Sequence, residues 1–294
     1  MAFLTYDDSG LVPARDQTRL FYGERGRGPD VLLLDGIGCD GWAWTHIQPR
    51  LARDHRVIHT QYRGHGRSGS PIDPERTAIG DLAEDALQVM EALRIPHAAI
   101  LAHSMGTQVA LEMYRQQPER IGALVLICGT AGNITQTFHG NDILHRILPA
   151  LTEHVRRYRP VVQAFWRRLP PRLSYRVATW MGEVDGAALD PDDFRQYVEH
   201  LSDIDLDLYL ALLREAGTHS AADVLPTIRV PTLVIGAERD TFTPSGVVKS
   251  MYDRIPDAEY LELKGGSHAA PAEQPERILE RLREFLHAVP AQVG

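Results

Sequence analysis

Residues 99–110 constrain the fold more than any other part of the chain. A short apolar run ends in the pattern small-x-Ser-x-Gly at residues 102–106 and passes directly into a helical pattern. Small residues on both sides of Ser104 suit a very tight, strained turn between a strand and a helix. Such a turn exposes the serine at the top of a sheet, which is the arrangement of a nucleophile elbow. An ordinary strand and helix joined by a serine would look similar, so the rest of the chain has to decide.

Strand-like and helix-like segments alternate through residues 1–130 and resume at about residue 225. Two short antiparallel strands are predicted at 11–14 and 19–24. Apolar runs typical of strands covered on both faces follow at 31–34, 57–60, 124–128 and 232–236, and a last strand is predicted at 259–263. Helical patterns between these runs imply parallel pairing with right-handed crossovers. We therefore predict an α/β fold.

Segment 131–224 departs from this alternation, because strand patterns vanish and helical patterns follow one another. Helices are predicted at 142–157, 161–169, 174–181, 192–201 and 205–216. We predict one α/β core formed by residues 1–130 and 225–294. Residues 131–224 would be inserted as a helical cap above the carboxyl edge of the sheet.

Composition argues against several other classes of protein. The chain has 294 residues, 44% of them hydrophobic, and a formal net charge of −8, which argues against a nucleic-acid partner. We find no apolar run that could span a membrane and no signal-peptide pattern, so we expect a cytoplasmic protein. Cys39 and Cys128 are too few for a disulfide framework or a cysteine zinc site, and the histidines show no metal-ligand spacing. We expect no metal, no cofactor, a small-molecule substrate, and a monomer or homodimer.

A nucleophilic Ser104 would need a base and an orienting acid. In one known type of triad, the serine comes first in the chain, an Asp or Glu follows a later strand, and the histidine comes last. His268 lies in a flexible loop after the last predicted strand, where its side chain can reach across the top of the sheet. Asp240 follows the preceding strand and is the preferred acid. Glu238 is the competitor, and it lies closer to the strand end.

Two backbone N–H groups are candidates for an oxyanion hole. Met105 follows the serine at the N-terminus of a predicted helix, where unpaired donors and the helix dipole favour a developing negative oxygen. Ile37 lies in a glycine-containing loop after the strand at 31–34, and glycines let the backbone approach a bound group closely. We expect these two groups to stabilise the oxyanion together.

Five segments together resemble the capped α/β hydrolase superfamily. They read Asp-Gly-Ile-Gly at 35–38, Tyr-Arg-Gly-His-Gly-Arg-Ser at 62–68, Ala-His-Ser-Met-Gly at 102–106, Gly-Ala-Glu-Arg-Asp at 236–240 and Gly-Gly-Ser-His at 265–268. The resemblance implies an eight-stranded, mostly parallel sheet flanked by helices. It also implies Ser104, Asp240 and His268 as the catalytic triad, with Ile37 and Met105 as oxyanion donors.

Three positions differ from the usual pattern of this superfamily. Asp35 stands where a histidine is usual, Gln61 stands where an aspartate is usual, and Ala102 replaces a glycine. None of these changes removes a triad group. Asp35 would place a carboxylate near the oxyanion loop, which leaves the polarity of that side of the pocket an open question.

The function expected from these residues is that of a cofactor-free serine hydrolase. It would cleave a carboxylic ester or lactone through an acyl-enzyme on Ser104, with His268 as base and Asp240 holding the imidazolium. A C–C bond hydrolase, an amidase or a perhydrolase would use the same triad. A hydrolase-like small-molecule receptor with slow turnover is an alternative from a different class.

Large side chains of the predicted cap are candidates for the substrate wall. They are Phe138, Phe165, Trp166, Trp180 and Met181. Each of them would also be suited to packing the cap helices onto the core. A thin helical layer has little interior of its own, so we expect some of them to face the pocket. An apolar wall of this kind would select a small to medium, largely apolar substrate.

Overall fold

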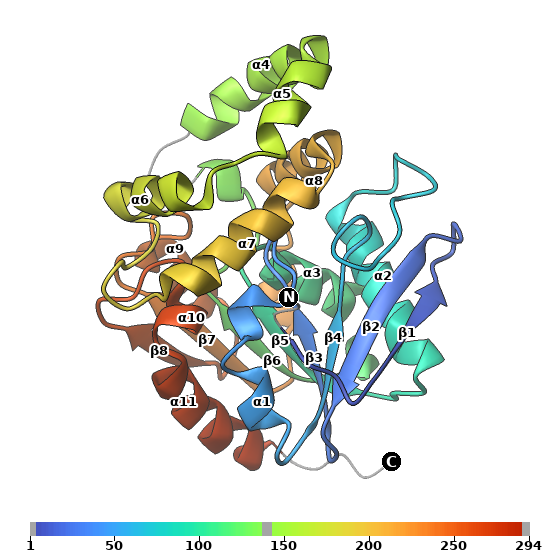
Figure 1. Ribbon diagram of the computed structural model, residues 1–294. Coiled ribbons are helices and arrows are strands. Elements are labelled where there is room, and N and C mark those ends of the chain that lie inside the picture. The colour runs from blue at the N-terminus through green and yellow to red at the C-terminus, as the bar shows by residue number, and fades with distance from the viewer. Residues whose placement is uncertain (1–3, 137–142, 290–294) are drawn as a thin grey trace.

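An eight-stranded sheet runs through the protein, as shown by the computed structural model, which describes residues 4–136 and 143–289 (Figure 1). The strand order is β1-β2-β4-β3-β5-β6-β7-β8. The β1–β2 and β2–β4 pairs are antiparallel, and every other neighbouring pair is parallel. The strands are β1 (Asp8–Pro13), β2 (Arg19–Arg25), β3 (Asp30–Leu34), β4 (Arg56–Thr60), β5 (Ala98–His103), β6 (Ile121–Ile127), β7 (Thr232–Ala237) and β8 (Glu259–Leu263).

Helices cover both faces of this sheet (Figure 1). Side chains alternate along a strand, so Leu32 and Leu34 pack with apolar residues of α2, α3 and α9, whereas Val31 and Leu33 pack with those of α1 and α11. Both cores are mostly apolar around the central strands, with buried His59 on β4 as an exception, which explains why these strands read as nearly continuous hydrophobic runs. The helices are α1 (Gln48–Leu51), α2 (Ile79–Ala92), α3 (Met105–Gln116), α9 (Ser245–Tyr252), α10 (Ala270–Glu273) and α11 (Pro275–Ala288).

Five further helices lie in the chain between β6 and β7 and gather over one edge of the sheet (Figure 1). They are α4 (Ile143–Arg157), α5 (Arg159–Trp166), α6 (Pro171–Met181), α7 (Pro191–Asp203) and α8 (Leu206–Thr218). A single antiparallel bridge between Gly132 and Ser220 joins the two ends of this segment. Its described residues contain no strand beyond that bridge, in agreement with the helical patterns of the sequence.

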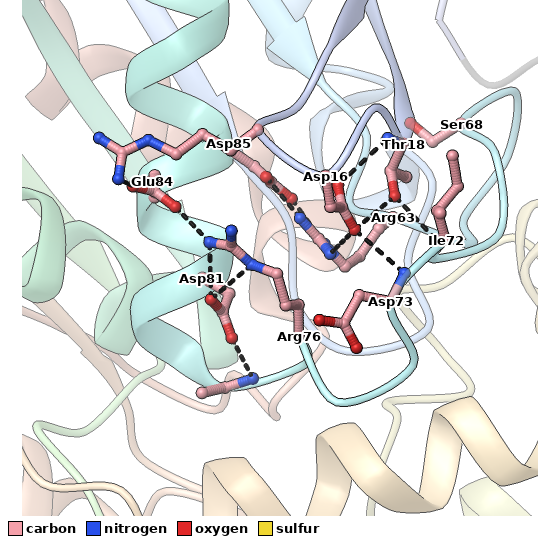
Figure 2. Close-up of polar contacts among 12 residues, drawn as sticks. Asp16, Thr18, Arg63, Ser68, Ile72, Asp73, Arg76, Asp81, Glu84 and Asp85 are labelled. Atoms are coloured by element: carbon pink, nitrogen blue, oxygen red, sulfur yellow. Dashed lines mark hydrogen bonds and ion pairs between the residues drawn. The ribbon is translucent and has the colours of Figure 1, made fainter.

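A buried ion-pair network fixes the loop that follows β4 (Figure 2). The Arg63 guanidinium is fully buried and binds both carboxylate oxygens of Asp85 in α2, at 2.8 and 2.7 Å. Its third nitrogen donates to Asp16, in the turn between β1 and β2, at 3.1 Å. Three elements that are distant in the sequence are thereby held together around one charge.

We predict that Arg63→Met lowers the free energy of unfolding by about 3–5 kcal/mol, because it leaves the Asp85 carboxylate buried without its partner. Arg76→Met is the matched control, since Arg76 pairs with Asp81 in the same region but is partly exposed. The control should lose about 1 kcal/mol or less. Urea unfolding of the two variants measures the difference, and equal losses would refute the assigned role of Arg63.

Candidate active site

Ser104 occupies a strained turn between β5 and α3. Its backbone has φ 54° and ψ −121°, and a positive φ is unfavourable for a side chain with a Cβ. The turn can form because α3 approaches β3 closely at Gly106, where a Cβ would lie 2.6 Å from the Leu34 carbonyl oxygen. Gly36 is also confined, though less tightly, since a Cβ there would lie 3.1 Å from the Ser104 Cβ. The sheet and its loops therefore determine where the serine hydroxyl lies.

The three residues predicted as a triad meet at the carboxyl edge of the sheet. His268 Nε2 lies 2.9 Å from Ser104 Oγ, and its Nδ1 lies 2.9 Å from one Asp240 oxygen and 3.1 Å from the other. The Asp240 carboxylate also accepts hydrogen bonds from the N–H groups of Phe242 and Thr243 and from the Thr243 hydroxyl. These donors hold the carboxylate in line with the imidazole.

Electrostatics in this cluster favour a basic imidazole. Burial alone would lower the pKa of His268, but the adjacent Asp240 charge and its hydrogen bond raise that pKa above its ordinary value. Burial would likewise raise the pKa of Asp240, and the His268 charge with the surrounding donors lowers it instead. The carboxylate is therefore ionised near neutral pH, and a proton on His268 is stabilised.

Glu238 is placed away from this cluster. Its side chain is exposed, accepts a hydrogen bond from the Gly265 N–H at 2.9 Å and faces Lys264. Asp240, one residue beyond the Ala237–Arg239 bend, is buried and reaches His268 instead.

His103 is a neighbour of the site that the sequence argument did not single out. Its Nε2–H donates to the His268 carbonyl oxygen at 3.1 Å, and the two rings lie 5.2 Å apart. Burial lowers the pKa of His103 to about 4, so its imidazole is neutral near pH 7. Its position directly before the serine was the available signal.

Ile37 and Met105, the two predicted oxyanion donors, line the same cavity as Ser104 and His268. Ile37 lies in the loop after β3, and Met105 is the first residue of α3. N–H groups in the first turn of a helix have no acceptor within that helix, so the Met105 N–H is suited to receive a negative oxygen.

Asp35 is buried and is absent from the cavity lining, so its carboxylate forms no part of the pocket wall. Its Oδ2 accepts hydrogen bonds from His59 Nε2 at 2.7 Å and from the Gly41 N–H at 2.9 Å. His59 Nδ1 in turn contacts the Tyr6 hydroxyl at 2.8 Å. The carboxylate thus joins the loop of residues 36–41 to β4.

A cavity of about 250 Å³ opens beside Ser104 and has a mostly apolar wall. Its aromatic lining consists of Trp42, Phe194, Tyr197, Tyr209 and Phe242. The Phe242 ring lies 4.8 Å from the His268 ring. Glu183, whose Oε2 accepts a hydrogen bond from Thr241 at 2.8 Å, is the one acidic residue of this lining. The cavity therefore suits an apolar group with few polar contacts.

The cap residues predicted to form this wall do not line the cavity. Phe165 and Trp180 are 68% and 85% exposed, and Met181 is also exposed. Trp166 lies one layer behind, with its ring 5.3 Å from that of Tyr209 and its Nε1–H donating to the Ile204 carbonyl. Phe138 falls outside the described residues. Among the helices between β6 and β7, α7 and α8 supply most of the lining, and α6 contributes Ala178.

Two features are absent from the described ranges. Residues 4–136 and 143–289 contain no helix long and apolar enough to cross a membrane. The same ranges contain no group of three or more His, Cys, Asp or Glu side chains placed to hold a metal ion.

The chain is similar in sequence and in fold to proteins named as hydrolases. A protein from Azorhizobium caulinodans named "Putative carbamate hydrolase RutD" is 30% identical over 272 residues, which cover 90% of this chain and 94% of the relative. The enol-lactonase from Burkholderia xenovorans LB400 shares the fold, with a TM-score of 0.76 and 21% identity over 95% of this chain and 100% of its own. The esterase from Exiguobacterium antarcticum has a TM-score of 0.75 and 21% identity over 95% and 99% of the two chains.

The family comparison covers most of the chain. The family described as "alpha/beta hydrolase fold" matches residues 29–275, which include every strand from β3 to β8 and the whole site. The relatives and the site geometry support a hydrolase activity. This chain belongs to the α/β hydrolase fold family.

Proposed function

We propose that this protein is a serine hydrolase that cleaves a carboxylic ester or lactone through an acyl-enzyme on Ser104. The observation that carries the proposal is the alignment of Ser104 Oγ, His268 and Asp240 at hydrogen-bond distances beside an apolar cavity. The mechanism needs only groups of this chain and water.

Each step follows from the positions of these groups. His268 Nε2 takes the Ser104 proton as Oγ attacks the carbonyl carbon, and Asp240 stabilises the imidazolium that forms. The N–H groups of Ile37 and Met105 stabilise the negative oxygen. His268 then gives its proton to the leaving alkoxide. In the second half, water loses a proton to His268, attacks the acyl carbon and releases the acid, and the proton returns to Ser104 Oγ.

The cavity favours an ester or lactone over a carbamate anion. Residues 131–224 act in this proposal as a cap, whose helices α7 and α8 close an apolar pocket over the serine. A free carbamate is small, polar and negatively charged, and the mostly apolar wall would offer it few hydrogen bonds. A neutral acyl or ring group would instead bury apolar surface against Trp42, Phe194 and Phe242.

We predict that Ser104→Ala lowers ester turnover by about 10⁴-fold or more, because the nucleophile is lost while the fold remains. Labelling by a fluorophosphonate probe should disappear with it. Ser202→Ala is the control, since Ser202 is buried in α7 and its hydroxyl only donates to the Glu199 carbonyl. Undiminished turnover in Ser104→Ala would disprove the assignment of the nucleophile.

The pH dependence of kcat/KM tests the assignment of Asp240 as the acid of the triad. His268 must be neutral to accept the serine proton, so kcat/KM should rise with pH through a pKa above the ordinary value of about 6.5. Asp240→Asn should lower kcat by about 10⁴-fold and move this limb to lower pH, because the charge that raises the pKa of His268 is gone. Glu238→Gln should change neither quantity. If Glu238→Gln has the larger effect, the acid is wrongly assigned.

The substrate class is tested with p-nitrophenyl esters from acetate to laurate, beside aromatic esters, lactones, a carbamate, an amide and a C–C diketone. We expect each methylene added to the acyl chain to lower the activation free energy by up to about 0.8 kcal/mol, until the pocket is full. This corresponds to a rise in kcat/KM of about fourfold per methylene. A flat profile, or a preference for charged acyl groups, would contradict an apolar pocket. A single turnover without further cycles would indicate a receptor instead of an enzyme.

A further inference from the structure

Exposed apolar side chains gather on three consecutive helices of the cap. Among the large apolar side chains exposed on the described surface, all but Leu11 and Ile72 lie between residues 143 and 181. This range corresponds to α4, α5 and α6, which lie at the end of the molecule away from β1 and α11 (Figure 1). Exposed apolar side chains concentrated in one segment of the chain mark a candidate interaction surface.

The exposure follows helical spacing, so it forms stripes. On α4, Ile143, Ile147 and Leu151 are exposed at intervals of four residues, while Leu148 and Val155 are buried against α8. The exposed and the buried apolar residues lie on one broad face of α4, and only part of that face packs against α8, whereas an ordinary surface helix buries its apolar face.

Helix α6 has the same character. Leu173, Val177 and Trp180 are exposed at helical spacing, whereas Ala178 lines the cavity. Between α4 and α6, α5 exposes Val161 and Phe165. Each of the three helices thus presents apolar side chains outward.

Positive charge accompanies this apolar surface. The whole chain has a net charge of −8, yet residues 143–181 contain eight arginines, no lysine and one acidic residue, Glu153. All eight arginines are exposed. Arg159 pairs with Asp205 and Asp207 of α8, and Arg172 and Arg176 lie on α6 beside its apolar stripe.

We propose that helices α4–α6 form a docking surface for anionic lipid bilayers. Amphipathic helices with Trp, Phe and Leu next to basic side chains lie in the interface plane, with the apolar groups inserted and the arginines at the headgroups. Trp180 and Phe165 would enter the acyl boundary, and Arg172 and Arg176 would bind lipid phosphates. The attachment is peripheral, in agreement with the absence of a membrane-spanning helix from the described ranges.

Charge and apolar exposure together favour an anionic bilayer over two other partners for this surface, a second copy of the chain and a nucleic acid. A symmetric dimer through the same surface would bring two arginine-rich faces together, and their repulsion opposes it. A nucleic acid would satisfy the arginines, but aliphatic side chains such as Val161 and Leu173 would gain nothing against a phosphate backbone. An anionic bilayer matches both the charge and the apolar exposure.

The test is co-sedimentation of the full chain with vesicles containing about 30% phosphatidylglycerol in phosphatidylcholine, against pure phosphatidylcholine. We expect binding to the anionic vesicles that weakens between about 0.1 M and about 1 M salt. Arg172→Gln with Arg176→Gln should lower the affinity by about 30-fold. Arg27→Gln with Arg53→Gln removes two exposed arginines elsewhere and should leave it unchanged.

A second set of variants, with tryptophan fluorescence as the readout, tests whether apolar side chains insert into the bilayer. Phe165→Ser with Trp180→Ser should abolish binding, whereas Leu11→Ser with Ile72→Ser, the exposed apolar residues outside this surface, should not. Trp42 and Trp44 are buried and Trp166 is partly buried, so a blue shift of tryptophan emission on vesicle addition would report Trp180. Trp180→Phe should remove the shift.

Several results would overturn the proposal. The first is no binding to anionic vesicles, and the second is a loss of vesicle affinity in the control variants as large as that in the test variants. The third is binding to duplex DNA as strong as binding to vesicles, unchanged by the Phe165 and Trp180 substitutions. A lipid-free dimer that dissociates in the same variants would assign the surface to a second copy of the chain. No ester turnover enters these measurements, so they stand or fall independently of the proposed hydrolase reaction.

Discussion

The close packing of helix α3 against strand β3 is the constraint on which the site depends. Gly106 lets the helix reach the Leu34 carbonyl, and that contact leaves Ser104 in a backbone conformation with φ 54°. The strain is tolerated because β3 and β5, the strands on either side of this contact, are almost completely buried and pair in parallel. It directs Oγ to the edge of the sheet where the loops after β7 and β8 bring Asp240 and His268. Ser104, Asp240 and His268, from three separate stretches of the chain, thus converge at one edge of the sheet.

The segment between β6 and β7 presents two different surfaces. Its inner helices, α7 and α8, contribute Phe194, Tyr197 and Tyr209 to the cavity wall. Its outer helices, α4–α6, expose arginines together with apolar side chains. In the proposed account the inner layer selects the acyl group, and the outer layer sets where the enzyme meets it. Ala178 on α6 contacts the cavity while Trp180 points outward, so this one helix borders both surfaces.

The sequence predicted the sheet and the convergence of Ser104, Asp240 and His268, because each depends on a local pattern at a strand end and on chain order. The sequence did not predict which residues form the wall of the cavity beside Ser104. The periodicity of α5 and α6 shows an apolar stripe but not whether that stripe faces the pocket, and the large side chains Phe165 and Trp180 are exposed instead. The role of Asp35 was open for a similar reason: its direction is set by His59 and Gly41, and no local pattern reports a contact with another strand.

A covalent acyl group on Ser104 is the central claim, and acid quenching of the enzyme during turnover of p-nitrophenyl butyrate tests it most directly. Mass spectrometry of the digested protein then locates any added butyryl group. The account predicts this group on the peptide that contains Ser104, present before butyrate is released and absent when His268 is replaced by alanine. Turnover with that peptide unmodified at every quench time, or a butyryl group on another residue, would contradict the account.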